Sequence, residues 1–247
     1  VALDLGPVRR KVDVSLFAVT QQLDGLTDRR AVGVEARWFV PGRSLVGLVD
    51  FDVGYSALNG AILLGNFEFW GKWFLSFDLD HRRAPVLTTR NALIGQPFRS
   101  LQDMQSAFSQ TEIEQLARDR TPITDLASVS LSRPLGSKWQ VALDASGMRT
   151  SDTPASGDVA ATPSTGTEIA FQAQLSGAGL WRANDLYVLT LRRQQSSLQS
   201  LDSAGLAVRM PLWGAWRIGP RLRVDRLQQK STASVRTALF PTLRIDY

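Results

Sequence analysis

The chain has 247 residues, of which 44% are hydrophobic and 21% charged, so it can form one large domain or two small ones. The lack of cysteine excludes disulfides, thiol catalysis and cysteine-based metal sites, and a single histidine, His81, excludes a multi-histidine metal site and most catalytic triads. The net charge of +5 raises nucleic acid or an anionic surface as a partner. No window approaches the ~18 consecutive apolar residues of a membrane-spanning helix, so any membrane crossing must use strands.

Apolar and polar residues alternate along most of the chain, which is the period of a β-strand. In the clearest segment, 216–225, one face carries tryptophan, isoleucine, proline, leucine and valine, and the other carries arginine, glycine and aspartate. The pattern predicts about twelve strands, each near the ~9–11 residues that a tilted transmembrane strand needs. They span residues 8–20, 30–40, 45–56, 61–70, 73–82, 122–133, 138–149, 167–177, 185–195, 203–212, 216–227 and 232–247.

Short and longer connections alternate between these strands. Short turns are predicted at 41–43, 71–72, 136–137 and 214–215, with a slightly longer one on the same side at 178–184, and longer connections at 21–29, 83–121 and 150–166. Short turns at one side and longer loops at the other are typical of bacterial outer-membrane barrels, whose short turns face the periplasm. Segment 150–166 is rich in small residues and proline, so we expect a mobile surface loop there.

All seven tryptophans lie near the predicted short turns. Their amphipathic rings suit the boundary between membrane and water, where outer-membrane barrels carry an aromatic girdle. The predicted girdle consists of Trp38, Trp70, Trp73, Trp139, Trp181, Trp213 and Trp216.

The long connection 83–121 has a helical pattern of its own. Apolar residues recur at helical spacing at Leu101, Met104, Phe108, Ile113 and Leu116. Ser100 with Asp103 marks one helix start, and Thr111 with Glu114 fits a capping box at a second. We therefore expect two short helices, near 100–108 and 111–118. Their apolar stripe indicates either simple packing or a constriction folded into or over a pore.

These features together predict an all-β fold, an antiparallel up-and-down transmembrane β-barrel of about twelve strands in a single domain over 1–247. A soluble β-sandwich or lipocalin-like barrel would alternate as well, but its apolar face would point inward at a core. The many charges in mid-strand and the tryptophans at strand ends favour a barrel embedded in outer-membrane lipid of a Gram-negative bacterium.

The end of the chain resembles Gram-negative outer-membrane barrels in one further respect. Leu239, Leu243, Ile245 and the aromatic Tyr247 match the alternating, aromatic-ended last strand of such barrels. The resemblance implies that the barrel assembly machinery is a partner.

Segment 73–135, and within it Asp78–Asn91, is similar to barrel domains attached to tetratricopeptide-repeat proteins of proteobacteria. This resemblance implies that the chain is a fragment of a larger protein, with a periplasmic helical-repeat domain or protein as a partner and with further strands after Tyr247. Some exopolysaccharide export porins share that layout, so the resemblance suggests a role in export.

The charges on the non-apolar face divide along the sequence. The early strands carry a predicted acidic wall, with Arg37 as its exception, and the late strands carry a predicted basic wall, with Asp225 and Asp246 as exceptions. The acidic wall consists of Asp13, Glu35, Asp50, Asp52, Glu68, Asp78 and Asp80. The basic wall consists of Arg192, Arg217, Arg221, Arg223, Arg236 and Arg244.

Two functions remain open for a lumen with these walls. In a narrow open pore, the arginine wall faces the acidic wall and the lumen passes or exports polar or anionic solutes or polysaccharide. In an occluded structural barrel, the charges pair with one another and the barrel anchors a periplasmic or surface partner.

Other functions find little support in the sequence. Nucleic-acid binding is not expected, because the arginines alternate with lipid-facing residues instead of forming a patch with stacking aromatics. His81 has Asp78 and Asp80 beside it in sequence but is expected at a strand end, so no catalytic residue, cofactor or metal is predicted and the protein is not expected to be an enzyme.

Overall fold

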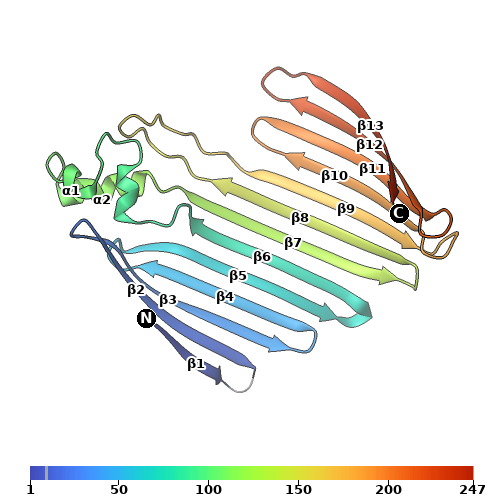
Figure 1. Ribbon diagram of the computed structural model, residues 1–247, viewed down its shortest axis with the longest axis horizontal. Helices are drawn as coiled ribbons and strands as arrows, with labels where there is room; N and C mark the ends of the chain where they lie inside the picture. Colours follow the sequence, from blue (N-terminus) through green and yellow to red (C-terminus); the bar gives the residue numbers. More distant parts are fainter. Residues whose placement is uncertain (9–10, 247) are drawn as a thin grey trace. The chain divides into compact units, whose positions relative to one another are not determined.

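The computed structural model describes residues 1–8 and 11–246 as an all-β protein with an antiparallel sheet of thirteen strands. Each strand is hydrogen-bonded to its neighbours in sequence, so the strand order is an up-and-down meander (Figure 1). The strands are β1 (Ala2–Val8), β2 (Val12–Leu23), β3 (Leu26–Val40), β4 (Arg43–Asp52), β5 (Ala57–Phe69), β6 (Trp73–Arg83), β7 (Ile123–Leu135), β8 (Trp139–Thr150), β9 (Glu168–Ala178), β10 (Leu186–Gln195), β11 (Gln199–Pro211), β12 (Arg217–Gln229) and β13 (Val235–Asp246).

The helices are short. They are the 3₁₀ helices η1 (Trp70–Lys72) and η2 (Thr89–Leu93) and the α-helices α1 (Leu101–Met104) and α2 (Gln110–Asp119). Among the described residues, none of the helices is long and apolar enough to cross a membrane.

The chain divides into two compact units. Unit 1 consists of Val1–Asn66, Phe77–Ala127 and Met148–Gly166, and unit 2 consists of Phe67–Ser76, Ser128–Gly147 and Thr167–Tyr247. Unit 1 therefore holds β1–β4, most of β5, and the helices η2, α1 and α2. Unit 2 holds η1 and β9–β13.

The twelve predicted strands correspond in order to β2–β13, but the strand count was wrong by one. The missed strand, β1, contains Gly6 and Pro7, which interrupt the alternation, and its register with β2 shifts between Asp4 and Pro7. Proline cannot donate to a ladder and is tolerated in edge strands, which is the position of β1 in the strand order.

The predicted closure into a barrel is not confirmed. The strand order runs from β1 to β13 without a pairing between these two strands among the described residues, so the sheet is open. The terminal Tyr247, part of the predicted last-strand signature, lies outside the described residues.

The predicted longer connection at 21–29 was also wrong, because β2 and β3 continue to a two-residue turn at Asp24 and Gly25. Both turn residues have positive φ, +53° and +80°. This is the geometry of a type I′ turn, which aspartate followed by glycine favours and which matches the twist of the flanking strands. The two strands therefore extend beyond the boundaries that periodicity alone suggested.

In unit 1 the strand register separates an exposed apolar face from a polar face. Leu16 lies opposite Val34, which lies opposite Val49, and all three side chains are exposed. On the other face Ala31 lies opposite Asp52, and both are buried. In a soluble protein the apolar face of such a sheet would be buried in a core. Here the apolar face is exposed.

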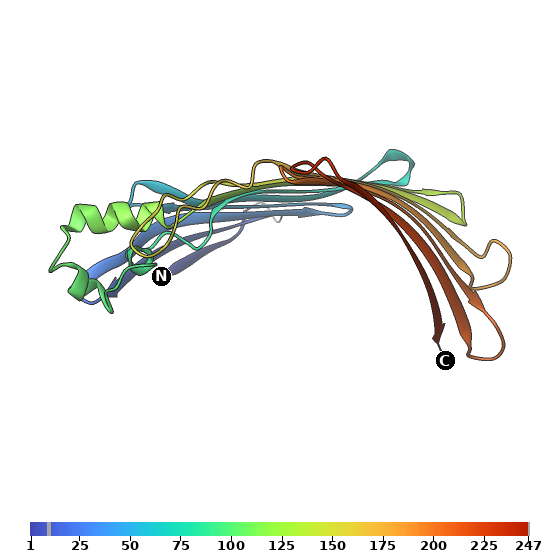
Figure 2. The same cartoon turned by 90° about the horizontal axis from the view of Figure 1, so that it is seen from above.

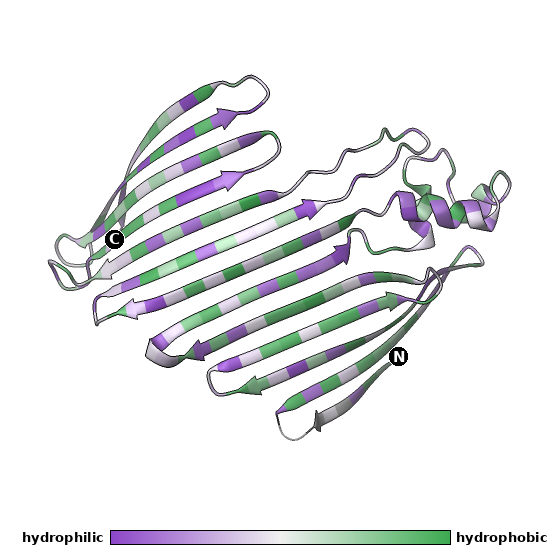
Figure 3. Ribbon diagram, turned by 180° about the vertical axis from the view of Figure 1, so that it is seen from behind, coloured by the Kyte–Doolittle hydropathy of each residue, from purple (hydrophilic) through white to green (hydrophobic). Residues whose placement is uncertain are grey.

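Unit 2 has the same arrangement. Leu189, Leu206 and Leu222 lie opposite one another across β10, β11 and β12, and all are exposed. The other face carries Arg192 opposite Ser203 opposite Asp225. The alternation appears as bands of colour along each strand in Figure 3, and β11–β13 bend along their length in Figure 2.

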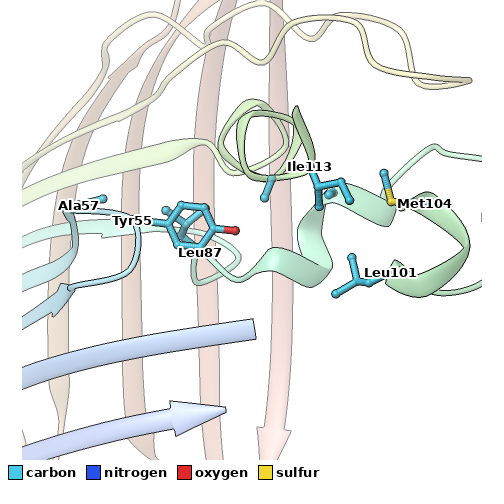
Figure 4. Packing of buried hydrophobic residues seen from close by; sticks show 8 residues of the cluster. Tyr55, Ala57, Leu87, Leu101, Met104 and Ile113 are labelled. Carbon is cyan, nitrogen blue, oxygen red and sulfur yellow. The ribbon is translucent and has the colours of Figure 1, made fainter. Parts of the chain in front are cut away.

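The helices of unit 1 enclose the main cluster of buried apolar residues, here called the cap core. Its members come from the β4–β5 turn, the first residue of β5, the chain that precedes η2, and the helices η2, α1 and α2 (Figure 4). They are Tyr55, Ala57, Leu87, Ala92, Leu101, Met104, Ile113 and Ala117. Leu23 and Leu26, from the β2–β3 turn, pack against this cluster, so the cap covers the ends of strands of its own unit.

Both predicted helices are present, but α1 ends at Met104 and not near residue 108, and the cap of the second helix was misplaced. Ser100 caps α1, because its side chain accepts a hydrogen bond from the Asp103 amide at 3.0 Å. The second helix starts earlier than predicted: Ser109 and Glu112, and not Thr111 and Glu114, form the capping box. The Ser109 amide and hydroxyl both donate to the Glu112 carboxylate, which lowers the pKa of Glu112.

Candidate functional site

The predicted basic wall occupies one face of β10–β13 in unit 2. Arg221 and Arg223 are two residues apart on β12, and Arg221 lies opposite Ala207 while Arg223 lies opposite Gly205. On the same face Arg192 lies opposite Ser203. The register also places Arg217, Arg236 and Arg244 on this face. We call this surface the arginine face.

One arginine of this face was missed by sequence reasoning. Arg209 lies opposite Leu186, on the same side of β10 as Arg192. Its guanidinium is 3.6 Å from the Asp246 carboxylate. The alternation along β11 could have revealed it: Arg209 is six residues from Ser203, and residues an even number apart in a strand lie on the same face.

The arginine face carries more positive than negative charge. Asp225 pairs with Arg223 at 3.1 Å, and Asp246 pairs with Arg244 at 2.6 Å as well as with Arg209. Over the part of the chain that the structure describes, no carboxylate lies within 4.0 Å of the guanidiniums of Arg192, Arg217, Arg221 or Arg236. These four groups are available to an anion.

A groove of about 590 Å³ lies on the arginine face. Its floor includes the small residues Ser203, Gly205 and Ala207 of β11. Arg192 lines it from β10, and Arg221 lines it from β12. Small floor residues between large flanking side chains make the depression, and these side chains come from three strands that pair directly.

An aromatic ring completes this groove. Phe240 of β13 lies opposite Arg223, whose guanidinium carbon is 4.7 Å from the ring centroid. Such a cation–π contact holds the arginine in place, and Asp225, which also lines the groove, pairs with its charge. Hydroxyl and amide groups that line the groove belong to Gln172, Thr190, Ser203 and Thr242.

The predicted acidic wall is partly neutralised by arginines of the same unit. Asp50 pairs with Arg29, and Glu35 pairs with Arg37 at 2.5 Å. Asp13 lies opposite Arg37 and is exposed. Arg29 was missed because it was placed in a connection, whereas it lies on β3, on the polar face.

The remaining acidic residues differ in environment. Asp52 is fully buried and accepts the Tyr55 amide at 2.9 Å, so it organises the β4–β5 turn. Asp80 pairs with Arg82, and its Oδ1 atom is buried without a hydrogen-bond partner, as is the Oδ1 atom of Asp78. Glu68 is exposed and belongs to unit 2, whereas the other six acidic residues belong to unit 1. That the acidic and basic walls face each other stays a prediction.

The cap is tied to the strand ends by polar contacts as well as by its core. The Tyr55 hydroxyl donates to Thr89 Oγ1 at 2.9 Å, and Thr89 donates to the Thr27 carbonyl at 2.7 Å. Burial, the largest cause, raises the pKa of Tyr55 to about 12, so this hydroxyl remains a donor. Asp28 accepts from both the amide and the guanidinium of Arg90.

Segment 150–166, expected to be a mobile surface loop, lies at the surface and is hydrogen-bonded to the cap. The Asp158 backbone amide donates to the Gly95 carbonyl at 2.6 Å, and the Gln96 side-chain amide donates to the Ser156 hydroxyl at 2.9 Å. Thr153 and Thr162 form an isolated bridge. Most of the segment is exposed, as expected of a surface loop, and it packs closely against Gly95, where a Cβ would lie 2.2 Å from Val159.

The predicted tryptophan girdle lies at one class of strand end. Its seven residues border the connections β3–β4, β5–β6, β7–β8, β9–β10 and β11–β12. Trp70, Trp181 and Trp213 are highly exposed. Trp139 packs over Gly177, where a Cβ would lie 2.8 Å from the indole.

The β9–β10 connection beside Trp181 is held by Asp185. This carboxylate accepts from the amides of Leu180, Trp181 and Arg182 at 2.8–2.9 Å. Burial alone would raise the pKa of Asp185, but these backbone donors lower it below its ordinary value.

His81 pairs with Asp125, 2.6 Å away, and not with its sequence neighbours Asp78 and Asp80. Among the described residues, no group of three or more histidine, cysteine, aspartate or glutamate side chains is placed to hold a metal ion.

The comparisons with known proteins give little beyond this geometry. No family model matches the chain, and no curated protein matches it. A solved structure described as a bacterial polysaccharide outer membrane secretin is similar over 100% of this chain and 77% of its own, with a TM-score of 0.45 and 12% identity. That likeness is too slight to assign a function to this chain.

Proposed function

We propose that this chain crosses the outer membrane of a Gram-negative bacterium by its strands and forms the wall of a narrow pore for polar or anionic solutes or polysaccharide. The observation that carries the proposal is that each unit exposes apolar side chains on one face and carries most of its mid-strand charges on the other. The charges on the apolar face of unit 2, Arg193, Asp202 and Arg226, lie together near the ends of β10, β11 and β12. Leu239 and Leu243, on the apolar side of β13, are 60% and 61% exposed. Exposed apolar area on this scale marks a surface made for lipid or a partner.

The arginine face supports a pore that attracts anions. Four of its guanidiniums have no carboxylate within 4.0 Å among the described residues. An uncompensated guanidinium in hydrocarbon is costly, so this face must meet water or an anion. The proposal includes outer-membrane lipid and the barrel assembly machinery as partners, with a periplasmic helical-repeat domain or protein as a third, and it assigns no enzymatic role.

The second candidate is an occluded barrel that anchors a periplasmic or surface partner. The local pairing of Asp50 with Arg29 and of Glu35 with Arg37 favours it, since these pairs fill the polar face of unit 1 with side chains. Conductance separates the two candidates.

In planar bilayers we expect the protein to conduct with a preference for anions. Replacing Arg192 and Arg221 by serine should shift the reversal potential toward cation selectivity, because two uncompensated positive charges leave the lumen. The matched control is Arg193→Ser, which removes a charge from the same strand but from the opposite face. Absence of conductance would favour the anchor, and conductance with unchanged selectivity would contradict a lumenal role for the arginine face.

The orientation can be tested by labelling, because the chain has no cysteine of its own. Gln102→Cys, in the cap, should react with an impermeant thiol reagent on whole cells, since longer connections face outward in outer-membrane barrels. Ser137→Cys, in the β7–β8 turn, should react only after the cells are opened. Both residues are exposed, so a reversed pattern would overturn the orientation and not merely report burial.

A further inference from the structure

The groove of the arginine face is a built feature of three adjacent strands. Its floor on β11 is Ser203, Gly205 and Ala207, every second residue of the strand, so the depression runs along the strand direction. The flanking strands β10 and β12 are each one pairing away, which separates them by roughly 10 Å at the usual strand spacing. That width accepts a single linear chain.

Arginines stand on both sides of the groove. Arg192 stands on one side, and Arg221 and Arg223 stand on the other, about 6.6 Å apart along β12 at two-residue spacing. A guanidinium fork matches a carboxylate in shape and can bond it through two hydrogens. Arg223 pairs with Asp225, which also lines the groove, so the charges open to a ligand are Arg192 on one side and Arg221 on the other. These two charges can hold a chain that carries acidic groups at intervals.

The uncharged side chains of the groove indicate the chemistry of the ligand between its acidic groups. Gln172, Thr190 and Thr242 offer amide and hydroxyl partners, which suit the hydroxyl groups of sugars. Phe240 adds an apolar ring against which the flat face of a pyranose could lie.

We propose that this groove is a binding site for a linear acidic polysaccharide, with Arg192 and Arg221 binding its carboxylates and the chain lying over Gly205. The site rests on the proposed function and deepens it by giving the pore a substrate class. Binding in the groove needs the fold of unit 2 alone, so it can be tested apart from conduction.

The experiment measures binding by isothermal titration calorimetry with the full chain in detergent micelles. The probes are an oligogalacturonate, the neutral maltohexaose, and a polyphosphate that is linear and anionic but contains no sugar. We expect the oligogalacturonate to bind most tightly and its affinity to fall with added salt. Arg192→Gln and Arg221→Gln should each weaken it about tenfold, since hydrogen bonds to charged groups are of that strength.

A second variant tests the shape of the groove without changing its charge. Gly205→Leu should abolish oligogalacturonate binding by filling the floor. A Cβ at Gly205 would lie 3.8 Å from the Leu222 carbonyl, an ordinary contact, so the strand can accept the side chain. Ala204→Leu and Arg193→Gln are the matched controls, because they change the opposite face of the same strands.

Each outcome decides the proposal. Equal binding of maltohexaose, equal or tighter binding of polyphosphate, or undiminished binding by Gly205→Leu would overturn it. If the protein conducts but does not bind oligogalacturonate, the proposed binding site is wrong and the proposed pore function stands. If it binds oligogalacturonate but does not conduct, the proposed pore function is wrong and the binding site stands.

Discussion

Replacing Leu222 with arginine is expected to block assembly of the protein into a membrane. Leu222 is in the middle of β12, opposite Leu206 and Pro241 on the apolar face, and its residue is 46% exposed. An arginine on the lipid side costs ~2–4 kcal/mol at the bilayer midplane and little near the interface. Insertion can be followed by urea titration of the protein folded into lipid vesicles, where the variant should unfold at lower urea.

The control for this experiment places the same side chain on the other face. Gln174→Arg lies on β9 opposite Thr190, on the side of the arginine face. It should leave the urea midpoint close to that of the unchanged protein, since that side chain meets water. If both variants lose stability equally, the assignment of lipid and water faces is wrong.

The sequence predicts the strands well because one face of each strand differs so sharply from the other. Around Leu222 every second residue is apolar and the residues between them are arginines, so only a strand keeps the two sets apart. Strand β1 was not predicted, because Gly6 and Pro7 interrupt the alternation of apolar and polar residues. Closure cannot be read from periodicity, because alternation is a property of each strand and says nothing of which strands are the last to pair.

The faces of the charged residues were predictable for the same reason, but their partners were not. Parity alone places Arg221 and Arg223 on one face. That Arg223 meets Asp225 and Phe240 depends on side-chain direction and on register with β13, which single-strand patterns leave undetermined. The groove likewise needs three strands in register, and its floor of small residues carries too weak an alternation to signal it.

The helix starts show a different limit. Serine and threonine at residues 109 and 111 are each followed three residues later by glutamate, so the sequence offers two capping boxes for one helix. Ile113 and Ala117, one turn apart, are buried in the cap core whichever residue begins the helix, so the apolar pattern cannot distinguish the two starts. The start at Ser109 therefore had to be seen in the structure.

The cap core yields the second large effect. Replacing Ile113 with alanine should destabilise the cap by ~2–5 kcal/mol, because the residue is 0% exposed and its removal leaves a cavity in the cap core. Alanine keeps the helix propensity of α2, so the loss comes from packing alone. Amide hydrogen exchange should therefore accelerate in η2, α1 and α2 while β9–β13 keep their protection.

The matched control is Gln115→Ala on the exposed side of the same helix, which gives up only a hydrogen bond to Asp119 and should leave exchange nearly unchanged. Accelerated exchange throughout the sheet in Ile113→Ala would mean that the cap and the strands unfold as one unit. Unchanged exchange in the cap would contradict its dependence on this core. We expect faster exchange in the cap helices and unchanged exchange in the strands. The reason is that nearly all residues of the cap core belong to turns, loops and helices and not to strands.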